Sequence, residues 1–442
     1  MNADSSHAPP AAGAQREQER EREAAFRAQV DADLPRNYLA HLLHGIFAQT
    51  GFQLLQAPTF LPAYVFSLSG STTLVGLARS CQALGMLATP VIGARLIEHR
   101  SRVIPMVFGT GAAMRLSVLA MALAGYYLGT QANLIAICVL MGAYGLFTGM
   151  QGVTFQFLVS KVIPVEKRGA LGGARSAIAG LVASTVGVIG GYIVEHNWLG
   201  NGYATVLLVA FAMAAIGLLP VLIMREPESP GRPQQSLVSR LRELPALMRS
   251  DPDYRAYTWA RALGAGGRMG LPYYVLYASN VMTLPPGGLG WLTGAILVAN
   301  RGSTLLWGLL ADRQGFRNVL GLSLVVWIGA TVLLMNATSF TLVLIGFVGL
   351  GVGIGGFEQA CLNMVLEFGT REDLPMRIAL SQTAEQMVNV VAPLAGGLIV
   401  ASASYLPMFA TAIAVQVGAL ALIVLRVREP RHRNRDQSAA KQ

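Results

Sequence analysis

Charged residues are scarce in this chain of 442 residues. Asp, Glu, Lys and Arg together make up 13% of the sequence and hydrophobic residues 53%, whereas soluble proteins contain about 25% charged and about 45–50% apolar residues. The sequence also lacks a polar stretch long enough to form a separate soluble catalytic domain. Both absences argue against a soluble enzyme and indicate a protein that crosses a membrane several times.

Cysteine is scarce as well. Cys81, Cys138 and Cys361 lie inside apolar segments and are too far apart in sequence to suggest a metal site. No His-Glu-x-x-His pattern, paired aspartates or Ser/His arrangement accompanies the acidic residues of the apolar segments. We therefore interpret the cysteines as free thiols and expect no metal, no other cofactor and no enzymatic activity.

The hydrophobic residues fall into twelve runs separated by polar or turn residues. A helix needs about 20 mostly apolar residues to cross the roughly 30 Å hydrocarbon core of a bilayer. The predicted fold class is therefore an all-α membrane protein with 12 transmembrane helices. The predicted spans are 38–67, 71–95, 103–127, 132–158, 171–194, 203–224, 256–280, 288–310, 318–336, 340–366, 378–402 and 405–426.

Lys and Arg are missing from every second loop. The loops after the odd-numbered spans contain neither residue, whereas the other loops and both tails carry nearly all of them. Because cytoplasmic loops collect Lys and Arg, we predict that both termini are cytoplasmic. The composition fits a multi-pass protein of a bacterial inner membrane. The net charge of +10 is then an orientation signal, and nucleic acid is not an expected partner.

The second half of the chain repeats the first. At an offset of 214 residues, Pro58 aligns with Pro272 and Gly76 with Gly290, so a kink at the two prolines could serve as a gate or be merely structural. The only long internal loop separates the two halves, each of which has six predicted spans. The predicted domains are a cytoplasmic N-terminal tail (1–37), an N-terminal six-helix bundle (38–224), a cytoplasmic linker (225–254), a C-terminal six-helix bundle (255–428) and a cytoplasmic C-terminal tail (429–442).

The loop between spans eight and nine carries a family signature. Residues 308–317 read GLLADRQGFR, which closely resembles the G-x-L-A-D-R-x-G-x-R loop of the major facilitator superfamily. The first-half loop is a weakened copy, with Ala94, Glu98 and His99 in place of Gly, Asp and Arg, and residues 164–169 resemble the superfamily's loop between spans four and five. The resemblance covers 38–428 and implies a secondary transporter, built from two six-helix repeats, that works by alternating access.

These loops place an acid beside basic side chains next to a small residue. Such a charge cluster can latch the two halves in one state if its ion pairs break in the other. For Arg317, an ordinary positive charge of a cytoplasmic loop is an equally good interpretation. The residues to which we assign a gating role are Glu98, Arg102, Arg168, Gly308, Asp312, Arg313, Gly315 and Arg317.

A few ionisable residues are predicted at membrane depth, where each costs about 2.5–3.5 kcal/mol. They are Arg79, Arg115, Arg261, Arg268, Arg301, Glu358 and Glu385, with His41 and His44 in the first span. A carboxylate in a poorly hydrated bundle can exchange protons near neutral pH, so we predict proton coupling at Glu358 and Glu385. The alternatives are an ion pair of Glu358 with Arg268 or Arg301 and a structural polar role for Glu385.

The resemblance implies a central cavity lined by spans one, four, seven and ten. Three glutamines of span one, at 49, 53 and 56, share one helical stripe, and the alternative to lining the cavity is hydrogen bonding between helices. The residues predicted at the cavity are His44, Gln49, Gln53, Gln56, Arg268, Tyr273, Arg301 and Asn363.

The five arginines outnumber the two glutamates predicted at depth, which favours an anionic solute. We therefore predict a monomeric, proton-coupled transporter of a small organic solute. The alternatives are efflux of hydrophobic or drug-like compounds, and a receptor or intramembrane enzyme on a transporter-like fold. Efflux is weakened because span four lacks Arg and Lys and because span five reads VGVIGG at 186–191, without the proline of the drug-antiporter signature.

Overall fold

The computed structural model describes residues 10–87, 89, 92, 100–227, 248–249, 251–368 and 374–428. The chain in these ranges is helical and contains no strand. The first-half helices are α1 (Pro10–Gln56), α2 (Phe60–Ser69), α3 (Thr72–Leu87), α5 (Ile104–Tyr127), α6 (Thr130–Val162), α7 (Val165–Glu195) and α8 (Gly202–Ile223). The second-half helices are α10 (Pro252–Ala265), α11 (Tyr274–Val281), α12 (Gly288–Gln314), α13 (Phe316–Met335), α14 (Phe340–Met364), α15 (Leu374–Ser402) and α16 (Tyr405–Arg426).

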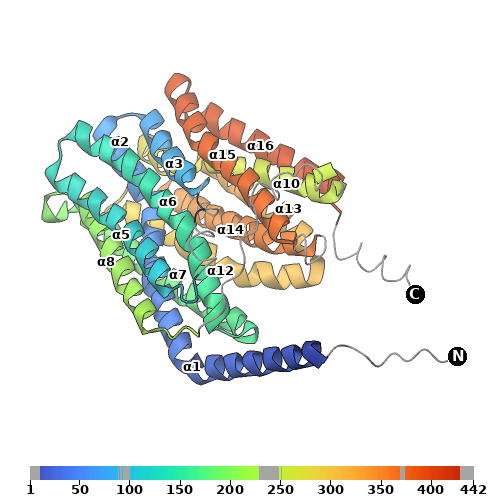
Figure 1. Cartoon of the computed structure of the whole chain (residues 1–442). Coiled ribbons are helices and arrows are strands. Elements are labelled where there is room, and N and C mark those ends of the chain that lie inside the picture. The colour runs from blue at the N-terminus through green and yellow to red at the C-terminus, as the bar shows by residue number, and fades with distance from the viewer. Residues whose placement is uncertain are drawn as a thin grey trace.

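Eight helices of the described ranges are long and apolar enough to cross a membrane, and they coincide with predicted spans three to six and nine to twelve. Span one is divided between α1 and α2, span seven is divided between α10 and α11, and span two is described only as α3. Helix α12 is long enough but carries Asn300 and Arg301 near its middle. Helix α1 begins at Pro10 and continues into the first span through Pro35, and its first part projects from the bundle (Figure 1).

The breaks in spans one and seven lie at repeat-related prolines. Pro58 lies between α1 and α2. Two short 3₁₀ turns, η2 (Gly266–Met269) and η3 (Leu271–Tyr273), lie between α10 and α11, and Pro272 belongs to η3. Proline has no backbone N–H, and its ring clashes with the preceding helical turn. Arg79 of α3 donates hydrogen bonds to the carbonyls of residues 55, 56 and 57, at 3.5, 3.2 and 2.8 Å. A cation at this position also complements the negative end of the α1 dipole.

The two halves meet through two pairs of helices, α3 with α15 and α7 with α12. Glycines permit this close approach. A Cβ atom on Gly76 would lie 2.3 Å from the carbonyl oxygen of Pro393, and one on Gly191 would lie 2.4 Å from the nitrogen of Gly290. Small residues allow helices in a membrane to pack backbone to backbone. Since Gly76 and Gly290 are repeat-related, the two helix pairs are equivalent contacts in the duplicated fold.

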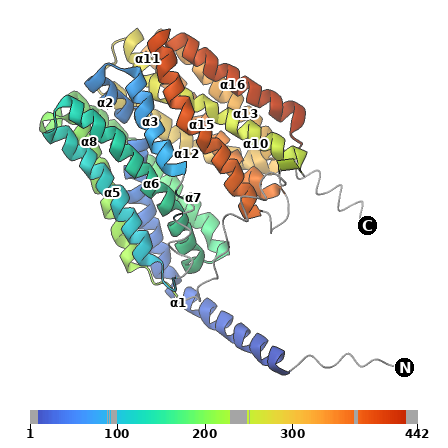
Figure 2. The same ribbon diagram turned by 45° about the horizontal axis from the view of Figure 1, so that its top comes forward.

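The helix ends define two faces of the bundle. We call the face at which α16 ends the terminal face and the other the opposite face. Several hydrogen bonds link described residues of the two halves toward the opposite face, where the helices are packed together, whereas the halves diverge toward the terminal face (Figure 2). These bonds are Thr59–Thr293 (2.7 Å), Ser184–Gly294 (3.0 Å), Thr72–Gly397 (3.1 Å), Tyr273–Thr72 (3.2 Å) and Glu195–Gly287 (2.6 Å). The opposite face is therefore the closed end.

Candidate functional site

A cluster of ion pairs lies inside the second half, at the break in span seven. Arg268 belongs to η2, and its guanidinium group donates to three side chains. Its Nη1 atom lies 2.5 Å from Glu385 Oε1 and 3.2 Å from Asn389 Oδ1, and its Nη2 atom lies 3.3 Å from Glu358 Oε1. Helices α14 and α15 supply these acceptors. The cluster thus joins a broken helix to two neighbours.

A second arginine completes the pairing of Glu385. The Nε and Nη2 atoms of Arg261 both lie 2.7 Å from Glu385 Oε2, and Nη1 donates to the hydroxyl of Ser381 at 3.0 Å. Each carboxylate oxygen of Glu385 therefore faces its own guanidinium group. Only 10% of the Glu385 side chain is exposed. Removing one partner from such a buried pair strands the other charge, which costs about 3–5 kcal/mol.

Glu358 differs from Glu385 in both exposure and bonding. Its side chain is 41% exposed and, within the described ranges, has one ion-pair partner, Arg268. The structure thus shows the pairing with Arg268 that the sequence left as an alternative to proton coupling, and the partner is not Arg301. A single, long ion pair at a half-exposed carboxylate is easier to break than the buried pairs of Glu385, because water can hydrate both separated charges. The role of Glu358 in proton coupling stays a prediction.

The three glutamines of the α1 stripe differ in their hydrogen bonding. Gln56 is exposed and donates to the hydroxyl of Tyr144 at 3.0 Å. Both amide atoms of Gln53 and the amide oxygen of Gln49 are buried and have no hydrogen-bond partner among the described residues. Buried amide atoms normally find partners, so these two side chains are good candidates for contact with a polar solute.

Three other predicted cavity residues are bonded within their own half or at the closed end. His44 is buried in the first half, with Nδ1 2.6 Å from the carbonyl oxygen of Gly217. Tyr273 is fully buried at the closed end, where its hydroxyl donates to Pro393 at 2.7 Å. In this conformation neither side chain lines an open cavity, because each is covered by packed helices. Asn363 is half-buried and donates to the carbonyl of Gln359 at 2.8 Å.

The buried arginines of the first half are bonded to carbonyl oxygens. Arg115 donates to Ala214 at 2.6 Å and to Gly111 at 2.7 Å, and its guanidinium group lies 5.1 Å from the ring centre of Phe52. Arg79 bonds the carbonyls at the break in span one, as described above. Within the described part of the chain, neither arginine has a carboxylate partner.

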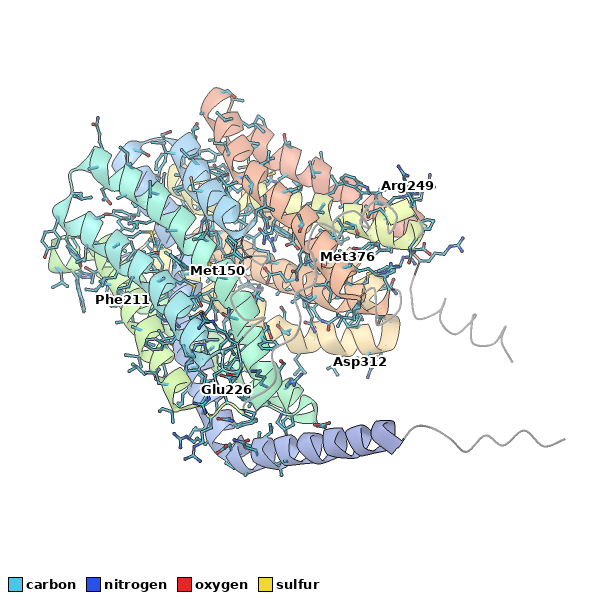
Figure 3. All side chains as sticks on the ribbon, viewed as in Figure 1. Met150, Phe211, Glu226, Arg249, Asp312 and Met376 are labelled. Carbon is cyan, nitrogen blue, oxygen red and sulfur yellow. The ribbon has the colours of Figure 1, made fainter. Side chains whose placement is uncertain are left out.

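The predicted gating residues are spread over the terminal face. Asp312 and Arg313 are exposed at the end of α12 (Figure 3), and Gly315 has φ 84°, a left-handed conformation that favours glycine. Arg317 donates to the carbonyls of residues 423 and 424, at 3.2 and 2.9 Å.

Three of the remaining gating residues belong to the described ranges. Arg168 donates to the carbonyls of residues 163 and 160, at 2.8 and 2.9 Å, Arg102 is exposed, and Gly308 lies beside the side chain of Gln359. Glu98 lies outside the described residues. The latch between the halves stays a prediction.

Sequence reasoning missed two buried ion pairs at the terminal face. Glu226 pairs with Lys161 at 2.8 Å and accepts hydrogen bonds from the backbone nitrogens of residues 103 and 104 at the start of α5 (Figure 3). Asp251 pairs with Arg377 at 3.0 Å and caps α10 by accepting from Tyr254. An acid directly before a proline at a helix start is a recognisable capping signal, so Asp251 could have been found. Glu226 had no comparable signal.

A family model of the Major Facilitator Superfamily matches residues 42–284 and 259–442. The chain belongs to the major facilitator superfamily. The predicted fold class, a twelve-span all-α membrane protein of two six-helix repeats, is therefore confirmed.

Two solved structures share this fold. A mutant of the nucleoside transporter NupG matches with a TM-score of 0.70 and 14% identity, over 88% of this chain and 100% of that one. The D-xylose-proton symporter matches with a TM-score of 0.68 and 13% identity, over 90% of this chain and 98% of that one.

A curated relative matches a smaller part of this major facilitator protein. Vacuolar basic amino acid transporter 5 of Saccharomyces cerevisiae is 25% identical over 135 residues, which are 30% of this chain and 23% of the yeast protein. The chain thus spans less than a quarter of that relative. The match supports membership of a family of membrane transporters and leaves the solute open.

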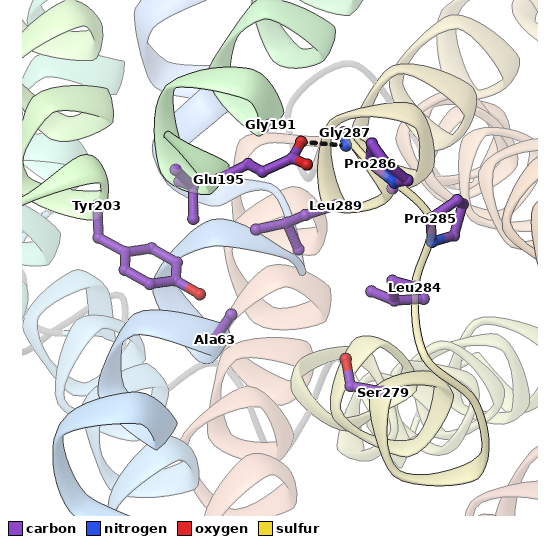
Figure 4. Close-up of a pocket in the computed structure, with 12 residues that line it drawn as sticks. Ala63, Gly191, Glu195, Tyr203, Ser279, Leu284, Pro285, Pro286, Gly287 and Leu289 are labelled. Atoms are coloured by element: carbon purple, nitrogen blue, oxygen red, sulfur yellow. Dashed lines mark hydrogen bonds between the residues drawn. The ribbon is translucent and has the colours of Figure 1, made fainter. Parts of the chain in front are cut away.

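A cavity of about 300 Å³ lies at the closed end, where the two halves of this major facilitator protein join. Figure 4 shows Tyr203 and Glu195 on one side and Ser279, Pro286 and Leu289 on the other, with Glu195 bonded to the backbone nitrogen of Gly287. The ion-pair cluster lies toward the terminal face instead. None of the cluster residues Arg261, Arg268, Glu358 and Glu385 lines this cavity.

Proposed function

We propose that this protein moves a small organic solute across a bacterial inner membrane by alternating access and couples that movement to protons at Glu358. The observation that carries the proposal is the half-exposed ion pair between Glu358 and Arg268, set in the break of span seven. We propose that the terminal face is cytoplasmic, because Lys and Arg gather there and are missing from the loops of the opposite face.

Protonation of Glu358 is the proposed coupling step. When water reaches Glu358, a proton that binds the carboxylate removes its charge and weakens its bond to Arg268. Arg268 then keeps the acceptors Glu385 and Asn389. Because Arg268 belongs to the short turns between α10 and α11, loss of one partner changes how tightly the broken helix is held to α14. A local charge change can bias a two-state equilibrium in this way.

Solute contact is proposed along the first span. Gln49 and Gln53 have buried amide atoms that find no partner in the described part of the chain, and a polar solute that bonds them would satisfy these groups. Opening toward the other side requires the hydrogen bonds of the closed end to break. We propose that the predicted gating residues of the terminal face then close that face, and that the transporter works as a monomer in the lipid bilayer.

Glu358→Gln is the variant that tests the coupling site, and solute counterflow and proton-driven accumulation in liposomes are the measurements. A labelled solute is first chosen by a thermal-shift screen of metabolites and drugs, since a ligand of the folded form raises its apparent stability. We expect the variant to lose proton-driven accumulation and to keep exchange down a solute gradient. The amide keeps the size of the side chain and cannot take up a proton.

Unchanged uphill accumulation in Glu358→Gln would refute the coupling site. Gln382→Ala is a suitable control, because this exposed residue of α15 makes no bond to the cluster among the described residues. Other outcomes overturn transport itself: conversion of the solute to a product indicates an enzyme, and saturable binding without counterflow indicates a receptor.

A further inference from the structure

Three hydrogen-bond donors without acceptors lie where α1, α7 and α12 meet. They are the Nε atom of Arg175, the Nε atom of Arg301 and the Nδ1 atom of His41, all buried and unpartnered among the described residues. Buried polar atoms are normally satisfied. Since two of these three groups can only donate, the group that would satisfy them is an acceptor.

Arg175 and His41 are held together inside the first half. A Cβ atom on Gly45 would lie 1.8 Å from Cδ of Arg175, so the aliphatic part of that side chain crosses α1 at this glycine. Nη1 of Arg175 lies 3.5 Å from Nε2 of His41. A guanidinium group has no acceptor atom, so Nε2 accepts here and neutral His41 carries its proton on Nδ1.

His41 has little freedom to turn away. Its side chain is 4% exposed, and its ring stacks on Phe155 with 5.4 Å between the ring centres. The Nδ1–H group is therefore a fixed, buried donor beside a guanidinium group.

Arg301 brings a second guanidinium group from the other half. A Cβ atom on Gly180 of α7 would lie 2.7 Å from Cβ of Arg301, so the base of this side chain packs against α7 across the junction. The like charges of Arg301 and Arg175 interact. Within the described ranges, Arg301 forms neither an ion pair nor a hydrogen bond, whereas Arg261 and Arg268 are bonded to carboxylates.

We propose that Arg175, Arg301 and His41 bind the anionic group, a carboxylate or a phosphate, of the transported solute. This inference rests on the proposed transport function and assigns the solute's chemical class. An oxyanion accepts several hydrogen bonds and favours guanidinium donors. It would also offset the repulsion between the two arginines. Because the arginines come from different halves, one bound anion bridges the junction that must rearrange during alternating access.

The first experiment measures anion binding to the full-length protein in a maltoside detergent, by thermal shift and calorimetry. The probes are inorganic phosphate, succinate and citrate. We expect at least one probe to stabilise the wild type and its Kd to rise by about tenfold or more in Arg175→Gln and in Arg301→Gln, as for loss of a charge-assisted hydrogen bond. Arg301→Lys should bind with intermediate affinity, because it keeps the charge and loses the planar fork.

Arg255→Gln is the matched control, since Arg255 is an exposed arginine of α10 near the terminal face and has no place in the proposed site. Its Kd should equal that of the wild type. Equal affinity in all three glutamine variants overturns the proposal. The proposal is also overturned if no probe stabilises the wild type and Arg301→Gln has a higher Tm than the wild type. In that case the two arginines only repel each other.

Native mass spectrometry separates a solute from a lipid headgroup. If wild-type protein retains phosphatidylglycerol that Arg301→Gln loses, while binding of the soluble probes is the same in both, a lipid occupies the site and the proposal fails. Liposome counterflow then distinguishes the two proposals. If the arginine variants bind anions like the wild type and still show counterflow, the anion site is rejected and transport is not. If anion binding depends on the arginines but no counterflow occurs, transport is rejected and the anion site is not.

Discussion

Arginines bonded inside the two halves of this transporter have different hydrogen-bond acceptors. In the first half, Arg79 and Arg115 donate to backbone carbonyl oxygens. In the second half, Arg261 and Arg268 donate to the carboxylates of Glu385 and Glu358. The chain is a duplication, so the same fold supports both solutions.

The difference matters for switching. A carbonyl oxygen keeps its partial charge at every physiological pH, so an arginine held by carbonyls has a constant environment. A carboxylate can take up a proton, and its attraction to arginine then falls. The surroundings of Arg79 and Arg115 are therefore fixed, whereas a proton can change those of Arg261 and Arg268. This contrast agrees with a coupling site at Glu358.

The largest effect on stability is expected from Glu385→Gln. The substitution leaves Arg261 and Arg268 buried with one neutral partner in place of a carboxylate, which costs about 3–5 kcal/mol of folding free energy. Thermal or denaturant unfolding of the purified protein in detergent measures this loss. Glu358→Gln serves as the comparison and should cost much less, because its side chain is 41% exposed. Equal losses in the two variants would show that exposure does not separate the two glutamates.

A smaller effect is expected from Arg115→Met in the first half. The substitution removes two charge-assisted hydrogen bonds, but both carbonyl acceptors belong to helices and keep their place in the backbone. The expected loss is about 1.5–3 kcal/mol. Because no carboxylate is stranded, proton-driven accumulation in liposomes should persist in folded protein. If folded Arg115→Met protein lost proton coupling and kept solute exchange, the contrast between the halves would be wrong.

The smallest effect is expected from Asn389→Ala, which removes a neutral acceptor from Arg268 inside the second half. Arg268 keeps both carboxylates, so the expected loss is about 0.5–1.5 kcal/mol, measured by the same unfolding experiment. A double-mutant cycle with Glu358→Gln tests whether the two contacts are coupled through the shared guanidinium group. A loss as large as that of Glu385→Gln would mean that the charge of the acceptor is not what stabilises the cluster.

The sequence predicted the spans well where helices are continuous. Spans three to six and nine to twelve coincide with described helices, because a run of apolar residues is sufficient to specify a crossing helix. The breaks at Pro58 and Pro272 were visible as repeat-related prolines. The extent of the break in span seven, with two 3₁₀ turns that carry Arg268, depends on the neighbouring helices and was not predictable.

The sequence identified the charged residues of the site but did not establish which of them pair with one another. Glu358, Glu385 and Arg268 were singled out because charge is costly at membrane depth. The sequence favoured Glu358 as the proton site and left its pairing open, and it gave no reason to connect Arg261 with Glu385. His44 and Tyr273 were placed at a cavity from helix position alone, whereas packing against α8 and α15 covers them.

The sequence by itself determined the number of apolar runs, the internal duplication, the one-sided distribution of Lys and Arg, and the short supply of charge at membrane depth. These are one-dimensional properties that follow from the length and hydropathy of each segment. Only the tertiary structure decided which charges meet, because residues such as Arg268 and Glu385 are 117 positions apart. It also decided which donors remain without acceptors, since that depends on every helix packed around them.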